Sequence, residues 1–513
     1  MKKRMFQLIA LLMVCIMGFA GCSNGSGSSS ASTEAKSNDQ VIVALNGEPA
    51  CLVGGFTANT GVYLCSEQAL EPLIDEDKDG NIVPLLATEW ELVDGKDYVF
   101  TLREGVKFHN GEPLTADDVV FTYTRYLEEG FAATFMSAID HIEKIDDSHV
   151  KIVYKTAYGP ALSTLAGNNM GIFSKKAYEE AGYDAFLRAP VGTGAYKFVE
   201  WKAGDFIRYE ANEEYWGGAP AIKNLIFRIY PDSSTAAIAL ENGEIDVLLN
   251  PAETDRSNLT NSSKVYFDET PSTMVTWAFF NCGEGSRFTD QRLREAFSYA
   301  IDREAVILGA VEGNGVLVNS MFPNNMPLSD NDYVARGYDK DKAIALMEEC
   351  GYGPANRFQI TVRVPQSNYY YKPMEIMQAM LSEVYVDMTL EAMETAAWFT
   401  DVLQAQDYEF NIIPTNIAFL DCDERYALFH SGEAQNNFGV SDPELDAAFD
   451  TNRTSTDIEE RRKACSDIIR IFDEKAYIIP LFGSMRTIAF NNQLQGVAAD
   501  AGYSYQVQEW SWA

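Results

Sequence analysis

The chain has 513 residues, of which 46% are hydrophobic, so it can bury more than one core and is long enough for about three domains. Its formal net charge of −35 at pH 7 argues against nucleic acid as a partner, because a phosphate-binding surface needs clustered cations. Four histidines and eight cysteines without CxxC spacing argue against a zinc or iron–sulfur centre, and we predict neither a metal nor a cofactor.

The first forty residues have the pattern of an export and anchoring segment. Three cations precede an apolar run, residues 5–19, that is too short for a good membrane span. The run ends in Phe-Ala-Gly before Cys22, the pattern of a bacterial lipoprotein signal whose cysteine thiol takes a diacylglycerol. We therefore predict a signal peptide over 1–21, lipid attachment at Cys22 and a flexible tether over 22–40. The alternative is an ordinary secretory signal that leaves the cysteine free.

The body opens with an apolar strand from Val41, followed by a predicted helix over 66–74. The first half of residues 75–86 matches the twelve-residue pattern of a calcium loop. The twelfth place, however, holds a leucine where a bidentate glutamate belongs. This segment is therefore predicted to be a plain acidic turn. A disulfide between Cys51 and Cys65 is geometrically possible, and the sequence leaves it open.

A strand, a turn and a helix follow. Tyr98, Phe100 and Leu102 alternate along one face of the strand. Thr115 and Asp118 form a capping box at the start of the helix. Further along, aromatic and β-forming residues separated by glycine turns indicate antiparallel strands.

Helices and strands alternate in the second half of the chain. Asp290 caps the clearest helix, whose apolar stripe begins at Leu293. Another helix is predicted to stop at Gly351, and a strand is predicted over 407–419. Because helices alternate with strands through much of the body, the predicted fold class is α/β.

Several of these segments, in this order, resemble the bacterial extracellular solute-binding proteins of family 5, the peptide/nickel-type receptors of ATP-binding-cassette importers. The resemblance runs from about Val41 to the C-terminus. It is carried by DGNIVPLLATEWEL, FTLREGVKFHNGEPLTADDVVFTYTR, PVGTGAYKF, NEEYW, GEIDV, FNCGEGSRFTDQRLREAFSYAIDRE, GYDKDKAIALMEECGY and DPELD.

The resemblance implies a two-lobed periplasmic-binding-protein-like fold (type II, cluster C) with an extra domain and a ligand cleft between the lobes. Lobe I is then expected at 41–70, 187–273 and 484–513, the extra domain at 71–186, and lobe II at 274–483. The implied protein is a monomer without enzyme activity that closes about a hinge on a di- or oligopeptide-like solute. It delivers that solute to permease and ATPase subunits at the outer face of the cytoplasmic membrane.

The resemblance also implies a ligand site. In the family, a strand-then-aspartate element has the form Gly-Trp-x-x-Asp-Tyr-x-x-Pro. Asp421 falls on the aspartate, which would bind the α-ammonium of a peptide, and Ile417 and Phe419 fall on the strand that would pair with the peptide backbone. Cys422 and Arg425 depart from the tyrosine and the proline of the pattern.

Two further residues complete the predicted site. Arg425 could pair with Asp423 or Glu424, or meet an acidic group of the ligand. Trp398 is a candidate aromatic wall, with core packing as its alternative. For Asp421 the alternative is a helix N-cap or a surface acid.

Other functions stay open at this point. The same fold could bind a nickel chelate, an oligosaccharide, an opine or haem, or could hand its ligand to a membrane sensor. Together, five residues suggest a metal site, but no second group of ligands accompanies them: Asp421, Cys422, Asp423, Glu424 and His430. A metal-dependent hydrolase or a carboxylate-pair glycosidase is the enzyme alternative, although spacing alone identifies no catalytic pair.

Overall fold

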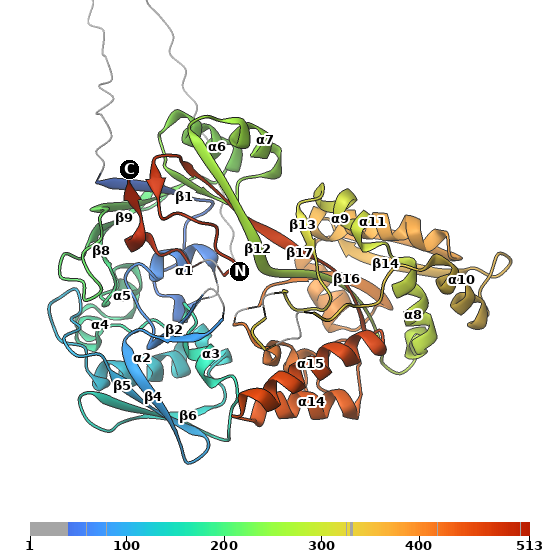
Figure 1. Ribbon diagram of the computed structural model, residues 1–513, viewed down its shortest axis with the longest axis horizontal. Helices are drawn as coiled ribbons and strands as arrows, with labels where there is room; N and C mark the ends of the chain where they lie inside the picture. The colour runs from blue at the N-terminus through green and yellow to red at the C-terminus, as the bar shows by residue number, and fades with distance from the viewer. Residues whose placement is uncertain are drawn as a thin grey trace, which may run out of the picture. The chain divides into compact units, whose positions relative to one another are not determined.

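The computed structural model describes residues 39–513 except 58, 78–79, 325, 329–331, 418 and 503. The predicted signal peptide, Cys22 and all but the last two residues of the predicted tether lie outside the described residues. Within them the protein is a mixed α/β structure, as predicted (Figure 1).

One large sheet runs through the structure (Figure 1). Among the described residues it has nine strands, and most of its neighbouring strands are antiparallel, whereas β1 is parallel to both of its neighbours. In spatial order the strands are β16 (Phe410–Thr415), β12 (Val265–Phe280), β17 (Ile478–Asn491), β11 (Val247–Leu249), β1 (Gln40–Leu45), β10 (Asn224–Ile229), β9 (Phe206–Ala211) and β8 (Tyr196–Lys202), with β13 (Gly315–Leu317) beside β17.

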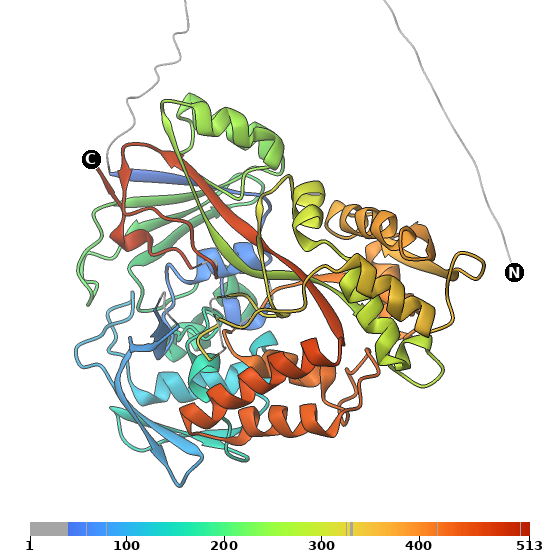
Figure 2. The same cartoon turned by 45° about the vertical axis from the view of Figure 1, so that its right-hand side comes forward.

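Two long strands, β12 and β17, run side by side along most of their length (Figure 2). Their pairing extends from Val265 opposite Asn491 to Phe279 opposite Ile478, with a change of register between Pro271 and Val275. This pair of strands passes from one hydrophobic core to another, because the two cores lie at its two ends.

The first core contains buried residues from Val41 to Val247 and from Ile488 to Trp510, and the second core contains residues from Val275 to Phe482. The first core includes residues on both sides of the expected boundaries at 71 and 187, so the segment expected to be the extra domain shares its interior with the segments expected to be lobe I. The division into lobes and an extra domain stays a prediction.

Strand β1 is buried on both faces, which explains its continuous apolar sequence. Val41, Val43 and Leu45 belong to the first core, whereas Ile42 and Ala44 pack on the opposite face under α6 (Ser233–Asn242). The strand is also held at its beginning, where the Trp512 indole N–H donates to the Gln40 carbonyl (3.1 Å).

A second, four-stranded antiparallel sheet has the order β4 (Ala87–Val93), β5 (Asp97–Leu102), β7 (His149–Tyr154) and β6 (Ile139–Lys144). Helix α2 (Ala116–Glu129) packs beside it. The predicted capping box at the start of α2 is confirmed, since the Thr115 backbone N–H donates to Asp118 Oδ2 (3.2 Å).

The remaining strands form three small sheets: β2 (Ile74–Glu76) with β3 (Ile82–Pro84), β14 (Phe358–Pro365) with β15 (Val386–Met393), and β18 (Leu494–Gln495) with β19 (Ser511–Trp512). The other α-helices are α1 (Thr60–Ser66), α3 (Ala161–Leu165), α4 (Lys175–Ala181), α5 (Tyr183–Arg188), α7 (Glu253–Asn261), α8 (Gln291–Ala300), α9 (Arg303–Val311), α10 (Lys340–Glu349), α11 (Asn368–Ser382), α12 (Thr395–Trp398), α13 (Tyr426–Phe429), α14 (Pro443–Thr454) and α15 (Ile458–Glu474). Short 3₁₀ or π turns are η1 (Gly54–Phe56), η2 (Phe131–Thr134), η3 (Arg287–Thr289), η4 (Phe399–Gln404), η5 (Cys422–Arg425) and η6 (Val507–Glu509).

The helix predicted over 66–74 is wrong. Asn59 caps a helix that begins earlier, at Thr60, and this helix ends at Ser66. Pro72 lacks the N–H that a helix interior needs, and Glu71 instead forms a β-bridge with Ile172. The acidic segment that follows is the β2–β3 hairpin, in whose turn Asp77 accepts from the Asn81 N–H (2.9 Å). Cys51 and Cys65 are free thiols.

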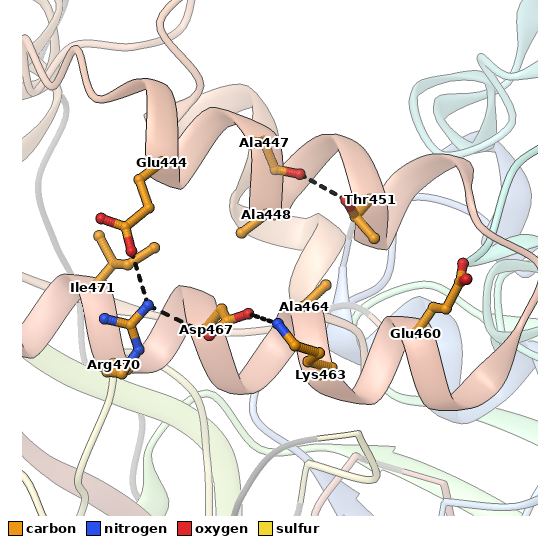
Figure 3. A pocket seen from close by; sticks show the side chains of 10 residues that line it. All are labelled: Glu444, Ala447, Ala448, Thr451, Glu460, Lys463, Ala464, Asp467, Arg470 and Ile471. Carbon is orange, nitrogen blue, oxygen red and sulfur yellow. Dashed lines mark hydrogen bonds and ion pairs between the residues drawn. The ribbon is translucent and has the colours of Figure 1, made fainter.

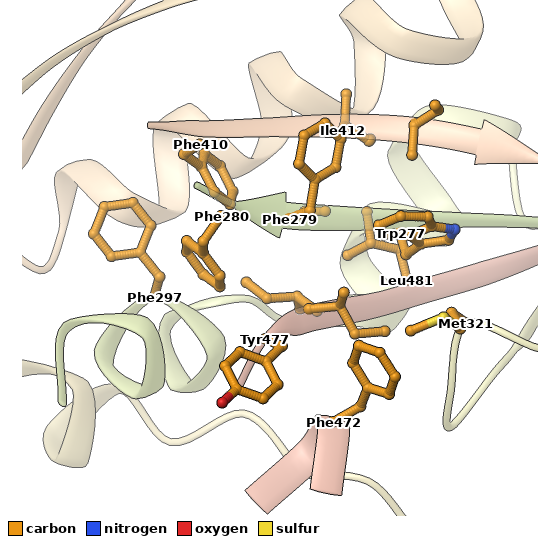
Figure 4. Packing of buried hydrophobic residues seen from close by; sticks show 14 of the residues in the cluster. Trp277, Phe279, Phe280, Phe297, Met321, Phe410, Ile412, Phe472, Tyr477 and Leu481 are labelled. Carbon is orange, nitrogen blue, oxygen red and sulfur yellow. The ribbon is translucent and has the colours of Figure 1, made fainter. Parts of the chain in front are cut away.

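Aromatic side chains fill the second core (Figure 4). Trp277, Phe279 and Phe280 come from β12, and Phe410 comes from β16. The Phe279 and Phe280 rings lie 4.9 and 4.7 Å from those of Phe438 and Phe288, respectively. This packing fixes the strand β16, and β16 leads directly into the predicted ligand site.

Candidate functional site

The predicted site segment leaves the sheet earlier than expected. Strand β16 ends at Thr415, so Ile417 and Phe419 do not lie on a strand, and this part of the prediction is wrong. The reason is local hydrogen bonding: the Phe419 N–H donates to Glu424 Oε1 (3.2 Å), and the Phe419 carbonyl accepts from the Asp421 N–H (2.8 Å). A turn therefore replaces the expected ladder positions.

Asp421 is 0% exposed and caps the 3₁₀ helix η5, where it accepts from the Asp423 N–H (2.9 Å). The Asn452 side chain donates to the same carboxylate (3.0 Å), and Arg461 forms an ion pair with its other oxygen. The N-cap alternative raised for this residue is thus present in the structure. Binding of a ligand ammonium by Asp421 stays a prediction, and such a ligand would share or displace these partners.

Asp423 joins residues of the two cores. Its carboxylate pairs with Arg453 (2.7 and 3.0 Å) and accepts from the Tyr158 hydroxyl (3.0 Å). Burial raises the pKa of Asp423, and the ion pair with Arg453 opposes that rise. Nearby, the Gly159 N–H donates to the Arg453 carbonyl (2.7 Å). Asp423 therefore pairs with Arg453 and not with Arg425, the partner considered for it in the sequence.

A third interaction completes this inter-core contact, by which we mean the pairs Tyr158–Asp423, Gly159–Arg453 and Phe135–Phe419. The Phe419 ring lies edge-on to Phe135, with 6.1 Å between the ring centroids. Tyr158 belongs to the first core, and Phe135 packs against it. The predicted ligand segment is thus one of the parts of the second half of the chain that contact the first core.

Arg425 is buried and braces the end of β16. Its guanidinium donates to the Thr415 hydroxyl (3.0 Å) and to the Asn416 carbonyl (3.4 Å). Burial lowers the pKa of Arg425, and the charge of Glu424 opposes that change. Its Nε is buried without a hydrogen-bond partner among the described residues.

Trp398 is fully buried in the second core, the alternative noted for it in the sequence. Its indole N–H donates to the Arg363 carbonyl (3.0 Å), and its ring meets Tyr370 edge-on at 5.6 Å.

The possible metal ligands in this segment do not converge. His430 stacks on Tyr426 at 4.5 Å and faces Asp450, whereas Cys422 is a buried free thiol. Among the described residues, no group of three or more His, Cys, Asp and Glu side chains could hold a metal ion.

A groove lies between α14 and α15 (Figure 3). Most of its charged residues are paired: Arg470 pairs with Glu444 (2.9 Å), and Lys463 pairs with Asp467 (2.6 Å), while Glu460 accepts from the Ser455 hydroxyl (2.8 Å). The same two helices direct Asn452 and Arg461 toward Asp421. Because both cations of the groove already have carboxylate partners, we do not place the ligand there.

Sequence reasoning missed a group of carboxylates near the inter-core contact. We call Glu67, Asp75, Glu76 and Asp500 the acidic cluster. Burial raises the pKa of each, and for Glu67, Asp75 and Glu76 the charges of neighbouring carboxylates add to this effect. No local pattern could have found the cluster, because its members are up to 433 positions apart (500 − 67).

The acidic cluster makes stability depend on pH. Burial, with the charges of Asp75, Asp421 and Asp77, raises the pKa of Glu76 from 4.5 to about 7. The folded protein therefore holds a proton that the unfolded chain releases above about pH 4.5, and stability falls as pH rises from there to about 7. Between about pH 5 and pH 8, the free energy of unfolding should fall less in Glu76→Gln than in the parent protein. We expect the difference to be about 1–2 kcal/mol, which allows for solvent screening.

Urea unfolding of both proteins at the two pH values measures this effect. Glu91→Gln, at an exposed acid on β4, is the matched control and should keep the pH dependence of the parent protein. An unchanged pH dependence in Glu76→Gln would contradict the assignment.

Comparison with known proteins places the chain in a family. Residues 81–437 match the family model described as "Bacterial extracellular solute-binding proteins, family 5 Middle". The chain is 30% identical over 376 residues to Heme-binding protein A of Haemophilus influenzae, covering 66% of this chain and 68% of that protein. It is 24% identical over 543 aligned positions to the oligopeptide-binding protein AppA of Bacillus subtilis, covering 99% of each.

A solved structure has a similar fold. The structure of HbpA2 from Haemophilus parasuis matches with a TM-score of 0.83 at 25% identity, covering 92% of this chain and 100% of that one. In the described part of the chain, no helix combines the length and apolar character that a membrane crossing requires.

Proposed function

Because the chain belongs to the bacterial extracellular solute-binding proteins of family 5, we propose that it captures a di- or oligopeptide-like solute and delivers it to an ATP-binding-cassette permease. The match over residues 81–437 carries this proposal. The family is one of solute-binding proteins of transporters, not of enzymes. The similarity to an oligopeptide-binding protein along nearly the whole chain favours a peptide as ligand.

The proposed mechanism is closure about the β12–β17 pair. These two strands connect the cores, and the register change between Pro271 and Val275 supplies a place where the ladder can bend. A ligand that touches residues of both cores would stabilise the closed arrangement, because only that arrangement provides both sets of contacts. The inter-core contact would form part of the closed state.

The proposed anchor is the lipid on Cys22, joined to the body by the tether over 22–40. The composition of this stretch, rich in serine and glycine, suits a flexible linker. The protein would then work at the outer face of the cytoplasmic membrane beside its permease and ATPase partners.

A second candidate ligand is haem. The observation that favours it is the 30% identity to a protein named Heme-binding protein A. Haem is large and mostly apolar, so it would need a broad apolar surface between the cores rather than backbone pairing.

Calorimetry on the purified protein decides between these ligands. The panel is Ala-Ala, Ala-Ala-Ala, a five-residue alanine peptide, haem and a nickel–histidine chelate. We expect one peptide to bind with 1:1 stoichiometry and to be recovered intact. Binding of haem or the nickel chelate without any peptide would overturn the peptide assignment, and peptide cleavage would show an enzyme instead.

A further inference from the structure

The acidic cluster brings together parts of the chain that are far apart in sequence. Glu67 follows α1, Asp75 lies on β2, and Asp500 belongs to the loop after β18. The Tyr505 N–H donates to Glu67 Oε1 (3.0 Å), and Asp500 accepts from the Ser504 N–H (2.7 Å). These hydrogen bonds hold the C-terminal loop beside α1, and Asp500 of the loop lies near Glu67 and Asp75.

Polar atoms at this place lack partners. The Tyr505 side chain is 5% exposed, and its hydroxyl lies beside the Asp500 backbone without completing a hydrogen bond. Glu67 Oε2 and Glu76 Oε1 are also buried without a hydrogen-bond partner among the described residues. A buried hydroxyl or carboxylate oxygen in this state costs free energy, so such atoms point to a missing partner.

The charge balance at this place is negative. Arg486 is the cation whose charge acts on Asp500 and Tyr505, and burial lowers its own pKa to about 10. Arg486 acts on Asp500, whereas the pKa values of Glu67, Asp75 and Glu76 are raised by burial and then by the charges of other carboxylates. A further cation would therefore stabilise the ionised form of the cluster.

We propose that the acidic cluster receives a positively charged group of the ligand, an ammonium or a guanidinium, with Glu67 and Asp500 as acceptors beside the Tyr505 hydroxyl. This inference rests on the proposed peptide-binding function. Among the described residues no group of three or more acidic side chains here could hold a metal ion, so we propose an organic cation, which two carboxylates can bind. A guanidinium can contact one carboxylate in bidentate fashion, whereas an ammonium donates separate hydrogen bonds to neighbouring carboxylates.

The cluster lies near the predicted ligand segment. The charge of Asp421 acts on Glu76, which is next to Asp75 on β2. A ligand that placed its cation in the cluster would therefore lie beside the inter-core contact. The Asp421 carboxylate already has three partners, whereas the buried carboxylate oxygens that lack a hydrogen-bond partner among the described residues belong to Glu67 and Glu76 of the cluster.

The test uses calorimetry with three peptides: Ala-Ala-Ala, acetyl-Ala-Ala-Ala and acetyl-Ala-Lys-Ala. The first carries an α-ammonium, the second carries none, and the third carries only a side-chain ammonium. We expect at least one charged peptide to bind about tenfold or more tightly than acetyl-Ala-Ala-Ala. Which charged peptide binds tightly identifies the source of the cation.

The variant for this test is Glu67→Gln with Asp500→Asn, which keeps the acceptors for the Tyr505 and Ser504 N–H groups. We expect the ratio of charged to neutral affinity to fall to about one to three in this variant. Glu91→Gln removes an exposed charge on β4 and should keep the original ratio. If the double variant does not fold, Tyr505→Phe should lower the same ratio by about threefold or more.

The outcomes separate this inference from the proposed function. If all three peptides bind the parent protein equally, or the ratio survives in the variants, the cluster is structural and the inference is wrong while peptide binding stands. If no peptide binds the parent protein, the proposed function fails and the inference fails with it.

Discussion

Asp421→Ala is expected to lower the free energy of unfolding by about 3–5 kcal/mol, because it leaves a buried guanidinium without its counterion. The Arg461 side chain is 7% exposed, and the Asp421 carboxylate is its ion-pair partner. The substitution also removes the cap of η5 and the acceptor for Asn452. Urea unfolding followed by circular dichroism measures the change.

Asp290→Ala is the matched control. Asp290 also caps a helix and pairs with an arginine, Arg292, but both side chains are exposed to solvent. We therefore expect a loss of about 1 kcal/mol or less. Equal losses in the two variants would contradict the importance of burial at Asp421.

The same variant tests the predicted ligand role of Asp421. Measured well below the unfolding temperature, an affinity for Ala-Ala-Ala weakened by about 2–5 kcal/mol would support an ammonium contact at Asp421. An unchanged affinity would leave Asp421 with the structural task alone.

Tyr158→Phe is expected to weaken ligand binding by about tenfold or more. The Tyr158 hydroxyl donates to the Asp423 carboxylate across the two cores, and a hydrogen bond to a charged acceptor is worth about 1.5–3 kcal/mol. If this bond belongs to the closed state, its loss lowers the population that can hold the ligand, and the apparent affinity falls by the same factor. Calorimetry with the best ligand of the panel measures this change.

Tyr426→Phe provides the comparison. The Tyr426 hydroxyl donates to Asp450 at the same distance, 3.0 Å, but both residues lie in the second half of the chain. This variant should lose stability without losing affinity. Equal affinities for Tyr158→Phe and the parent protein would show that the inter-core contact does not contribute to ligand capture.

Local features of the fold could be predicted from sequence because their causes lie within a few residues. The capping box of α2 and the Asp290 cap of α8 both depend on side chains next to the backbone groups that they satisfy. Gly351 ends α10 as predicted, since it adopts a φ of 88° that other residues rarely accept.

The site was harder to predict because its energetics depend on distant residues. The partners of Asp421 lie 31 and 40 positions away, and no pattern around Asp421 indicates them. Asp423 pairs with Arg453, whereas Arg425 turns to Thr415. These partners follow from how the helices pack, and the order of the residues in the sequence does not indicate them.

The composition of the first core has a consequence for export. This core needs residues 41–247 together with residues 488–510, whereas the second core draws only on the contiguous stretch 275–482. A chain that crosses a membrane from its N-terminus can therefore assemble the second core while the last strands are still inside. The first core has all of its residues only once the C-terminal stretch has emerged, so we expect the core that begins earlier in the sequence to be completed later.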